Sequence, residues 1–361
     1  MTRPPRIRLN QEEYDLIQEF RGIQDTAEEM QLDVRDVKHG WLKSKTASVF
    51  FKNPEFEIPQ FDPDAIDWKF IVKGLTFPAI PKIEQEKKSG IFDRLVISDA
   101  HIAMNPNPDG YSQYGGKWDE KELDDRLLAI VNTVLIKKNS NTIIVDDLGD
   151  LADGWDAQTV RKGHDLPQNM DNQKTFDVAL KFKLKLASRL SQHYEFVIFN
   201  NICEDNHSGA FGYVINSAFK IAIELMADNV KVTNHRKFIN HYQFKKNVFI
   251  ICHGKDSKNL KFGFKPHIDK PQTEKIDNYI DANFLLQPKV RIEFSKGDSH
   301  QLLFDHSSSD RFDYFNFMAL SPSSSWIQTN YKRGISGATL FNFDGTNDYD
   351  IKHIFFAWKE Q

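Results

Sequence analysis

The hydrophobic pattern of the chain changes repeatedly from residue 90 onward. Short apolar runs rich in Val, Ile and Phe alternate with longer stretches in which apolar residues recur every three or four positions. The first pattern is typical of buried strands and the second of amphipathic helices. The predicted strands are 94–99, 141–150, 194–201, 247–254, 289–297, 312–320, 337–343 and 351–358, and the predicted helices are 119–138, 174–192, 212–228 and 274–285. This order predicts a layered α/β protein with additional strands late in the chain.

The N-terminal region has a different pattern. Apolar residues from Tyr14 to Met30 fall at helical spacing, and Asp33 is a candidate cap for a second short helix that carries Trp41. Residues 11–45 are therefore predicted to be helical, within a small helical region at 1–50. This pattern fits either a helix-turn-helix or a helical hairpin whose only role is packing. Gln31 occupies the position where the turn of a helix-turn-helix usually has glycine, which favours the packing hairpin.

Residues 51–89 are rich in proline and charge, which predicts an extended connector with a boundary near Lys88. The main domain then spans 90–361. No apolar run approaches the roughly 18 residues of a membrane helix, and the basic start has no apolar segment behind it, so neither a membrane span nor a secretory signal is expected. With only two cysteines, Cys203 and Cys252, and a net charge of −4, we expect a cytoplasmic protein that is not coated by nucleic acid.

Polar residues with metal-binding capacity follow several of the predicted strands, at the point where each strand ends. They are Asp99 and His101, Asp150 and Asp153, Asn206 and His207, His253, and Asp298 and His300. Ligands bind beyond the carboxyl ends of the strands in open α/β sheets. Oxygen and nitrogen donors collected from five strand ends therefore predict a metal site.

The order of these motifs is D-x-H, G-D-x-x-D, N-H, H-G and G-x-x-H, and it resembles the calcineurin-like metallophosphoesterase superfamily over about residues 90–345. The whole chain, including the segment at 37–54, looks like phage-type members of that superfamily, which places it in a bacterial cell or a phage-infected host. The resemblance implies a four-layer αββα sandwich, in which two β-sheets lie between helical layers.

The same resemblance implies two divalent metal ions with a shared carboxylate. The implied ligands are Asp99, His101, Asp150 and His300 for one ion, and Asp150, Asn206, His253 and Asp298 for the other. A metal-activated hydroxide would then attack phosphorus. His207 would steady the phosphate and protonate the leaving group, and Asp153 would orient a ligand.

Three residues depart from the pattern of the superfamily. Asp205 and Ser208 flank the N-H pair where glycine and aspartate are usual, and Asp298 replaces a histidine. Ser208 removes an expected partner of His207. The oxygen-rich ligand set favours Mn²⁺, with Mg²⁺, Fe and Zn²⁺ as alternatives.

These features predict a metal-dependent phosphoesterase that acts on a phosphodiester in DNA or RNA. The choice of nucleic acid rests on the five lysines between Lys255 and Lys270, the helical N-terminal region and the phage-type resemblance. One alternative is a phosphatase acting on nucleotide or protein phosphomonoesters. The other is a DNA-binding module on the same fold, whose site is weakened by Ser208 and Asp298.

Overall fold

The computed structural model describes residues 39–43, 48–52, 91–110, 116–160, 165–255, 262, 266–324, 335–345 and 348–356. The chain divides into two compact units, Met1–Asp67 and Trp68–Gln361. In the first unit, β1 (His39–Lys43) and β2 (Ser48–Lys52) form an antiparallel pair.

The prediction of a helical region at 1–50 is wrong for residues 39–43, which form β1 and include Trp41, and for residues 48–50, which lie in β2. Ser48–Lys52 contains one β-branched and two aromatic residues, which favour a strand, and His39–Lys43 contains Trp41 and can pair with it as the adjacent segment of the chain. The rest of the predicted helices, at 11–38, and the predicted boundary near Lys88 lie outside the described residues.

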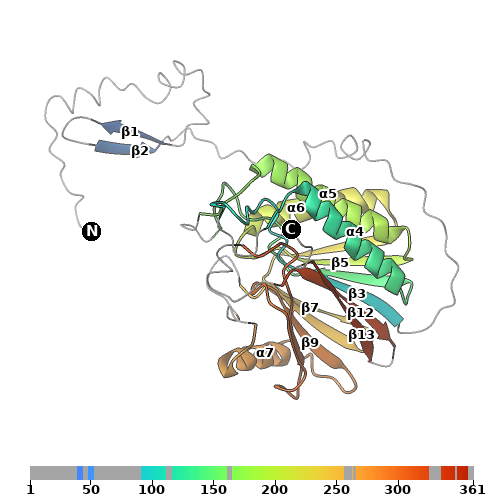
Figure 1. The fold of residues 1–361 in the computed structure, drawn as a ribbon. Helices are drawn as coiled ribbons and strands as arrows, with labels where there is room; N and C mark the ends of the chain where they lie inside the picture. The colour runs from blue at the N-terminus through green and yellow to red at the C-terminus, as the bar shows by residue number, and fades with distance from the viewer. Residues whose placement is uncertain are drawn as a thin grey trace. The chain divides into compact units, whose positions relative to one another are not determined.

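The second unit contains two stacked β-sheets with helices on their outer sides, as Figure 1 shows. The first sheet comprises β3 (Ile91–Ile97), β4 (Thr142–Asp147), β5 (Phe196–Ile202), β6 (Val230–His235), β12 (Gly337–Asp344) and β13 (Tyr349–Phe355). The second comprises β7 (Ile239–Phe244), β8 (Asn247–Cys252), β9 (Arg291–Lys296), β10 (Leu303–Asp305) and β11 (Asp313–Asn316). The helices are α4 (Glu120–Lys137), α5 (Asn172–Ser191), α6 (Gly209–Met226) and α7 (Lys270–Ala282). The predicted four-layer sandwich is confirmed.

The topology brings many strand ends to one edge. The strand orders are β13-β12-β3-β4-β5-β6 and β10-β11-β9-β8-β7. Strands β3 to β6 are parallel to one another, with α4, α5 and α6 as their connections, and β8, β9 and β11 are also mutually parallel. Parallel strands end at the same edge of their sheet, so the loops that follow them are neighbours.

In the second unit, the three described strands that the sequence pattern did not predict, β6, β7 and β10, are all edge strands. An edge strand is partly exposed to water, and in β6 buried and exposed residues alternate along Val230–Thr233. The continuous apolar run that marks a central parallel strand is therefore missing.

Strand alternation divides the core into layers. In β3, Leu95 and Ile97 pack with α4, α5 and α6, whereas Phe92 and Val96 belong to the cluster between the sheets. Phenylalanine is the commonest residue of that inner layer. Its buried phenylalanines are Phe92, Phe249, Phe315, Phe317, Phe341 and Phe343. On the far side, Ile276 and Ile280 of α7 cover the second sheet.

Arg94 is the one strongly basic group of β3 that points into the layer between the sheets. It is fully buried; its Nε donates to Asp146 Oδ2 of β4 at 2.6 Å, and its Nη1 donates to Glu293 of β9. Nη2 donates to Ser295 Oγ at 2.9 Å, and the guanidinium lies 4.2 Å from the ring centroid of Phe249. One cation therefore joins the two sheets.

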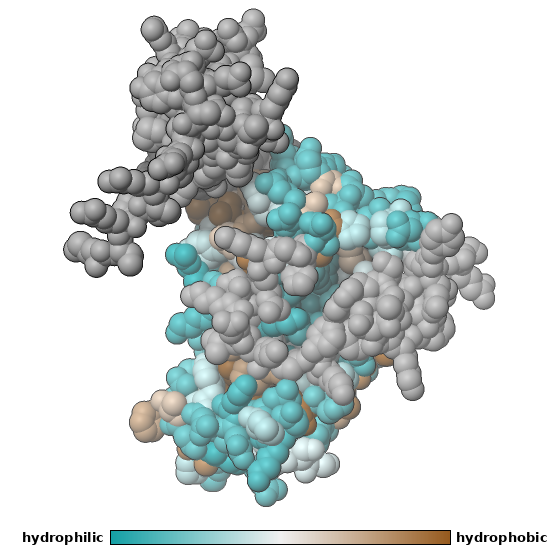
Figure 2. Space-filling model, turned by 90° about the vertical axis from the view of Figure 1, so that its left-hand side faces the viewer, coloured by the Kyte–Doolittle hydropathy of each residue, from teal (hydrophilic) through white to brown (hydrophobic). Residues whose placement is uncertain are grey.

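No helix among the described residues is long and apolar enough to cross a membrane. The described residues on the face shown in Figure 2 are mainly hydrophilic, with separate hydrophobic patches among them.

We expect Arg94→Met to lower the free energy of unfolding by about 3–5 kcal/mol, because it leaves two buried carboxylates without their cation. Urea denaturation measures the change. As a control, Lys185→Met removes an exposed ion pair with Asp124 and is expected to cost less than about 1 kcal/mol. Similar small losses in both variants would contradict the role assigned to Arg94.

Candidate metal centre

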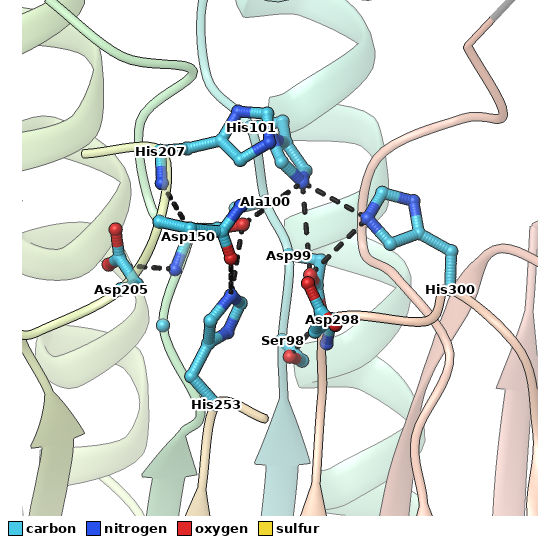
Figure 3. A network of polar contacts seen from close by, with 12 residues as sticks. Ser98, Asp99, Ala100, His101, Asp150, Asp205, His207, His253, Asp298 and His300 are labelled. Carbon is cyan, nitrogen blue, oxygen red and sulfur yellow. Dashed lines mark hydrogen bonds and ion pairs between the residues drawn. The ribbon is translucent and has the colours of Figure 1, made fainter. Parts of the chain in front are cut away.

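The predicted site residues converge where the strands of the two sheets end (Figure 3). Asp99 and His101 follow β3, and Asp150 follows β4, while His253 follows β8 and His300 follows β9. The loops after β3 and β4 continue the pairing of their strands, because Asp99 N–H donates to Gly149 O at 3.0 Å and His101 N–H donates to Asp150 O at 2.9 Å. Residues far apart in the sequence are thus fixed by backbone hydrogen bonds.

Five of the seven predicted ligands have a left-handed backbone. They are Asp99 (φ 54°), His101 (φ 41°), Asp150 (φ 50°), Asp298 (φ 68°) and His300 (φ 54°). This conformation costs a residue other than glycine about 1–2 kcal/mol. Such strain accumulates at functional sites, where the surrounding structure holds the backbone in place.

Asp99, His101 and His300 form the first group of potential ligands. The Nε2 atoms of His101 and His300 are 3.1 Å apart, and Asp99 Oδ1 lies 3.3 Å from His300 Nε2. Asp99 Oδ1 is buried and receives no hydrogen bond from the described residues. Two imidazole nitrogens at this distance repel each other unless a proton or a metal ion lies between them, so the group fits a cation.

Asp150 joins the first group to a second. Its Oδ2 lies 3.7 Å from His101 Nε2 and 3.1 Å from His253 Nε2. His253 Nε2 is also 3.1 Å from Asn206 Oδ1, and His253 Nδ1 donates to Leu148 O at 3.0 Å. Because Nδ1 carries a proton, Nε2 is the atom that can bind a metal, and both of its neighbours are acceptors. The second group therefore also fits a cation.

Asp153 holds two imidazoles with one oxygen. Its Oδ1 lies 2.8 Å from His101 Nδ1 and 3.1 Å from His207 Nδ1. A carboxylate only accepts, so both Nδ1 atoms donate and both Nε2 atoms are left to face the site. Burial would raise the pKa of Asp153, but the hydrogen bonds from His101 and His207 outweigh burial and lower it. Asp153 can therefore fix the orientation of both rings, and the orienting role toward a metal ligand that the resemblance implies stays a prediction.

The Asp298 carboxylate is not part of the Asp/His clusters that these residues form. Its backbone N–H donates to Asp99 Oδ2 at 3.2 Å, whereas its Oδ1 lies 3.6 Å from Lys255 Nζ. Within the part of the chain that the structure describes, three Asp/His clusters can hold a metal, and none includes Asp298. The clusters are Asp99, His101 and His300; His101, Asp150 and His207; and Asp99, Asp150 and His253.

Asp205 supports the site, a role that the sequence did not reveal. Its Oδ2 accepts from Asp150 N–H at 3.0 Å, and its Oδ1 accepts from Ser208 N–H at 2.7 Å. Burial and the charge of Asp150 raise the pKa of Asp205 to about 7. Asp205 lies four residues before the start of α6, where an aspartate can accept from backbone N–H groups of the helix start, and this is the only signal the sequence contains. Asp205 and Ser208 are thus partners of each other.

We expect Mn²⁺ binding near about pH 8 to release one or two protons, since metal ligation requires neutral imidazoles. Burial alone would lower the pKa of His253, but Asp150 raises it to about 10. Burial likewise opposes protonation of His101, but Asp153 and Asp99 raise its pKa well above the ordinary value. Titration calorimetry in buffers of different ionisation enthalpy measures the release. Heats independent of the buffer would contradict these protonation states.

We expect Asp153→Asn to weaken Mn²⁺ binding by about 10- to 100-fold, because it loosens the imidazole of a ligand. A calorimetric titration gives the affinity. Asp177→Asn, an exposed carboxylate change on α5, serves as the control and should leave the affinity unchanged. Equal affinities for all three proteins would rule out an orienting role for Asp153.

No protein-family model matches the chain, and no curated protein matches it. Among solved structures, a double mutant of Vps29 from Entamoeba histolytica is similar at 10% identity and a TM-score of 0.29, over 73% of this chain and 99% of that one. A predicted phosphoesterase from Streptococcus pneumoniae is similar at 8% identity and a TM-score of 0.30, over 72% and 87%. The sulfate thiohydrolase SoxB from Thermus thermophilus is similar at 8% identity and a TM-score of 0.30, over 75% and 58%. Values this low establish neither a family nor an activity for this chain.

Proposed function

We propose that this chain is a divalent-metal-dependent phosphoesterase that hydrolyses phosphodiester bonds in nucleic acid. The observation that supports it most is the position of Asp150 Oδ2, which lies 3.7 Å from His101 Nε2 and 3.1 Å from His253 Nε2. A carboxylate between two histidine groups is what a pair of cations requires. The order of the motifs, which resembles calcineurin-like metallophosphoesterases, supports the same function.

The chemistry of the donors fits two metal ions. The proposed ligands are Asp99, His101, Asp150 and His300 for one ion, and Asp150, Asn206, His253 and Asp298 for the other. Asp298 Oδ2 is buried and has no hydrogen-bond partner among the described residues, a deficit that a bound ion would relieve. The donors are oxygen and nitrogen only, which favours Mn²⁺. When bound, such a pair activates a water and stabilises charge on phosphoryl oxygens.

His207 is the proposed proton donor. Its side chain is 21% exposed, whereas those of His101, His253 and His300 are 3%, 0% and 8% exposed. It is therefore the site histidine most accessible to a substrate. Its Nδ1 donates to Asp153, so Nε2 is the atom available to a leaving group. Asp153 thereby supplies the orientation that an aspartate at position 208 would have supplied.

The proposal that the substrate is a nucleic acid is supported by fewer observations. Lys255 lies beside Asp298 at the site and can contact a phosphate, while most of the lysine-rich segment that follows lies outside the described residues. The strand at β1 removes part of the helical region that also favoured DNA. Phage-type membership and a cytoplasmic location stay predictions from the sequence.

We expect Mn²⁺-dependent hydrolysis of bis(p-nitrophenyl) phosphate, and we expect Asp150→Ala to abolish it while circular dichroism shows a folded protein. His207→Gln should lower kcat by about 10²- to 10⁴-fold, because the leaving group loses its proton donor. Lys185→Met, a surface change on α5, is the control with unchanged turnover.

Faster hydrolysis of p-nitrophenyl phosphate than of the diester would favour the phosphatase alternative instead. Tight, salt-sensitive DNA binding without turnover in any metal would overturn the enzyme and support the binding module.

A further inference from the structure

Trp155 is a half-exposed aromatic residue on the loop that carries Asp153. Its side chain is 48% exposed, and its ring meets Phe211 edge-on, with centroids 4.9 Å apart and planes at 76°. Phe211 lies in the first turn of α6, four residues after His207. Trp155 is therefore linked to the region of the proposed proton donor in two ways. It is close to Asp153 in the chain, and its ring contacts Phe211.

The loop holds Trp155 in place. The backbones of Trp155 and Gln158 exchange two hydrogen bonds of 3.0 Å, and between them Asp156 and Ala157 are both left-handed, at φ 51° and 54°. This is a type I′ turn, which usually contains glycine or asparagine. The chain thus keeps a strained two-residue turn directly after an exposed tryptophan.

Side chains from a neighbouring segment fix the strained turn. Asn172 Oδ1 accepts from Asp156 N–H at 3.0 Å, and Gln168 Oε1 accepts from Ala157 N–H at 3.1 Å. Gly154 also fits only as glycine, since a Cβ there would lie 2.3 Å from Gln158 O at φ +103°. A rigid loop presents the indole at little cost in conformational entropy when a ligand binds.

Among the described residues, the other exposed large aromatic side chains are Phe196, Phe284 and Phe355. Phe196 is the first residue of β5, at the opposite end of that strand from the site. Phe284 follows α7 and Phe355 ends β13, and neither belongs to a loop that carries a predicted ligand. Trp155 therefore differs from these three residues, because its loop also carries a residue of the proposed site.

We propose that Trp155 stacks on an unpaired nucleobase next to the bond that is cleaved, which makes single-stranded nucleic acid the substrate class. This inference rests on the proposed function. Stacking on an indole accepts every base, because each base offers a π-face, and it requires a base that is not paired in a duplex. The role assigned to Trp155 is substrate selection.

A cation near the same edge of the sheet supports the proposal. Arg236 is exposed and directly follows β6, which is parallel to β5, so it lies at the edge where the site residues are found. Its guanidinium carbon lies 4.8 Å from the ring centroid of Tyr213, a second residue of the first turns of α6. A guanidinium held on an aromatic ring can bind the backbone phosphate of a strand that crosses the start of α6.

Fluorescence anisotropy tests the inference without turnover, with EDTA present. The probes are a labelled oligothymidylate and a labelled chain of equal length with abasic sites throughout. The wild type should bind the first more tightly. Trp155→Ala should weaken oligothymidylate binding by about tenfold, the range of one stacked base, and leave binding of the abasic chain unchanged. Trp155→Phe should restore part of the loss, and Arg236→Ala should weaken both probes alike.

Phe284→Ala is the matched control, since it removes another exposed aromatic side chain and should change neither affinity. Equal binding of the two probes by the wild type, or no binding of either, would overturn the inference, and so would an unchanged Trp155→Ala variant. Failure of the proposed function is a separate result, because it appears as absent Mn²⁺-dependent hydrolysis and leaves the anisotropy measurement intact.

Discussion

The alignment of the two sheets is the constraint on which the proposed site depends, and Arg94 is the fully buried cation among the residues that hydrogen-bond across them, which also include Tyr242 and Arg291. Asp99 and Asp150 extend from strands of the first sheet, whereas His253 and His300 extend from strands of the second. A displacement of one sheet along the other by one residue, about 3.3 Å, would separate these groups by more than the length of a metal–ligand bond. The guanidinium hydrogen-bonds both sheets a few residues below the strand ends.

Beyond the strand ends, precision comes from backbone turns that are unfavourable in isolation. The left-handed residues of the site are held by hydrogen bonds to neighbouring loops, such as Asp150 N–H to Asp205. Gly297 illustrates how closely these loops approach each other, since a Cβ there would lie 2.2 Å from Ser98 Oγ and 2.9 Å from Asp99 Oδ2. The free energy of folding of the sandwich thus offsets the cost of these turns and maintains a loop geometry that the loops alone would not adopt.

The sequence predicted those parts of the molecule that depend on interactions between residues close together in the chain. Central strands such as β4 are apolar runs, and α4 has the expected period, so both were found. The chemistry of Asp99, His101, Asp150, His253 and His300 was visible from the strand ends that they follow. The edge strands β6 and β7 were missed because one of their sides is solvated. The support from Asp205 could not be predicted, since it depends on a contact across 55 residues of chain.

One oxygen atom of Asp153 serves both His101 and His207, and this sharing has a consequence for regulation of the chemistry. Its Oδ1 accepts from His101 Nδ1 at 2.8 Å and from His207 Nδ1 at 3.1 Å, so the orientation of each ring depends on the same atom. The proposed metal ligand His101 and the proposed proton donor His207 are thus positioned by one carboxylate oxygen. A substitution at Asp153 therefore changes the hydrogen bonding of both imidazoles at once.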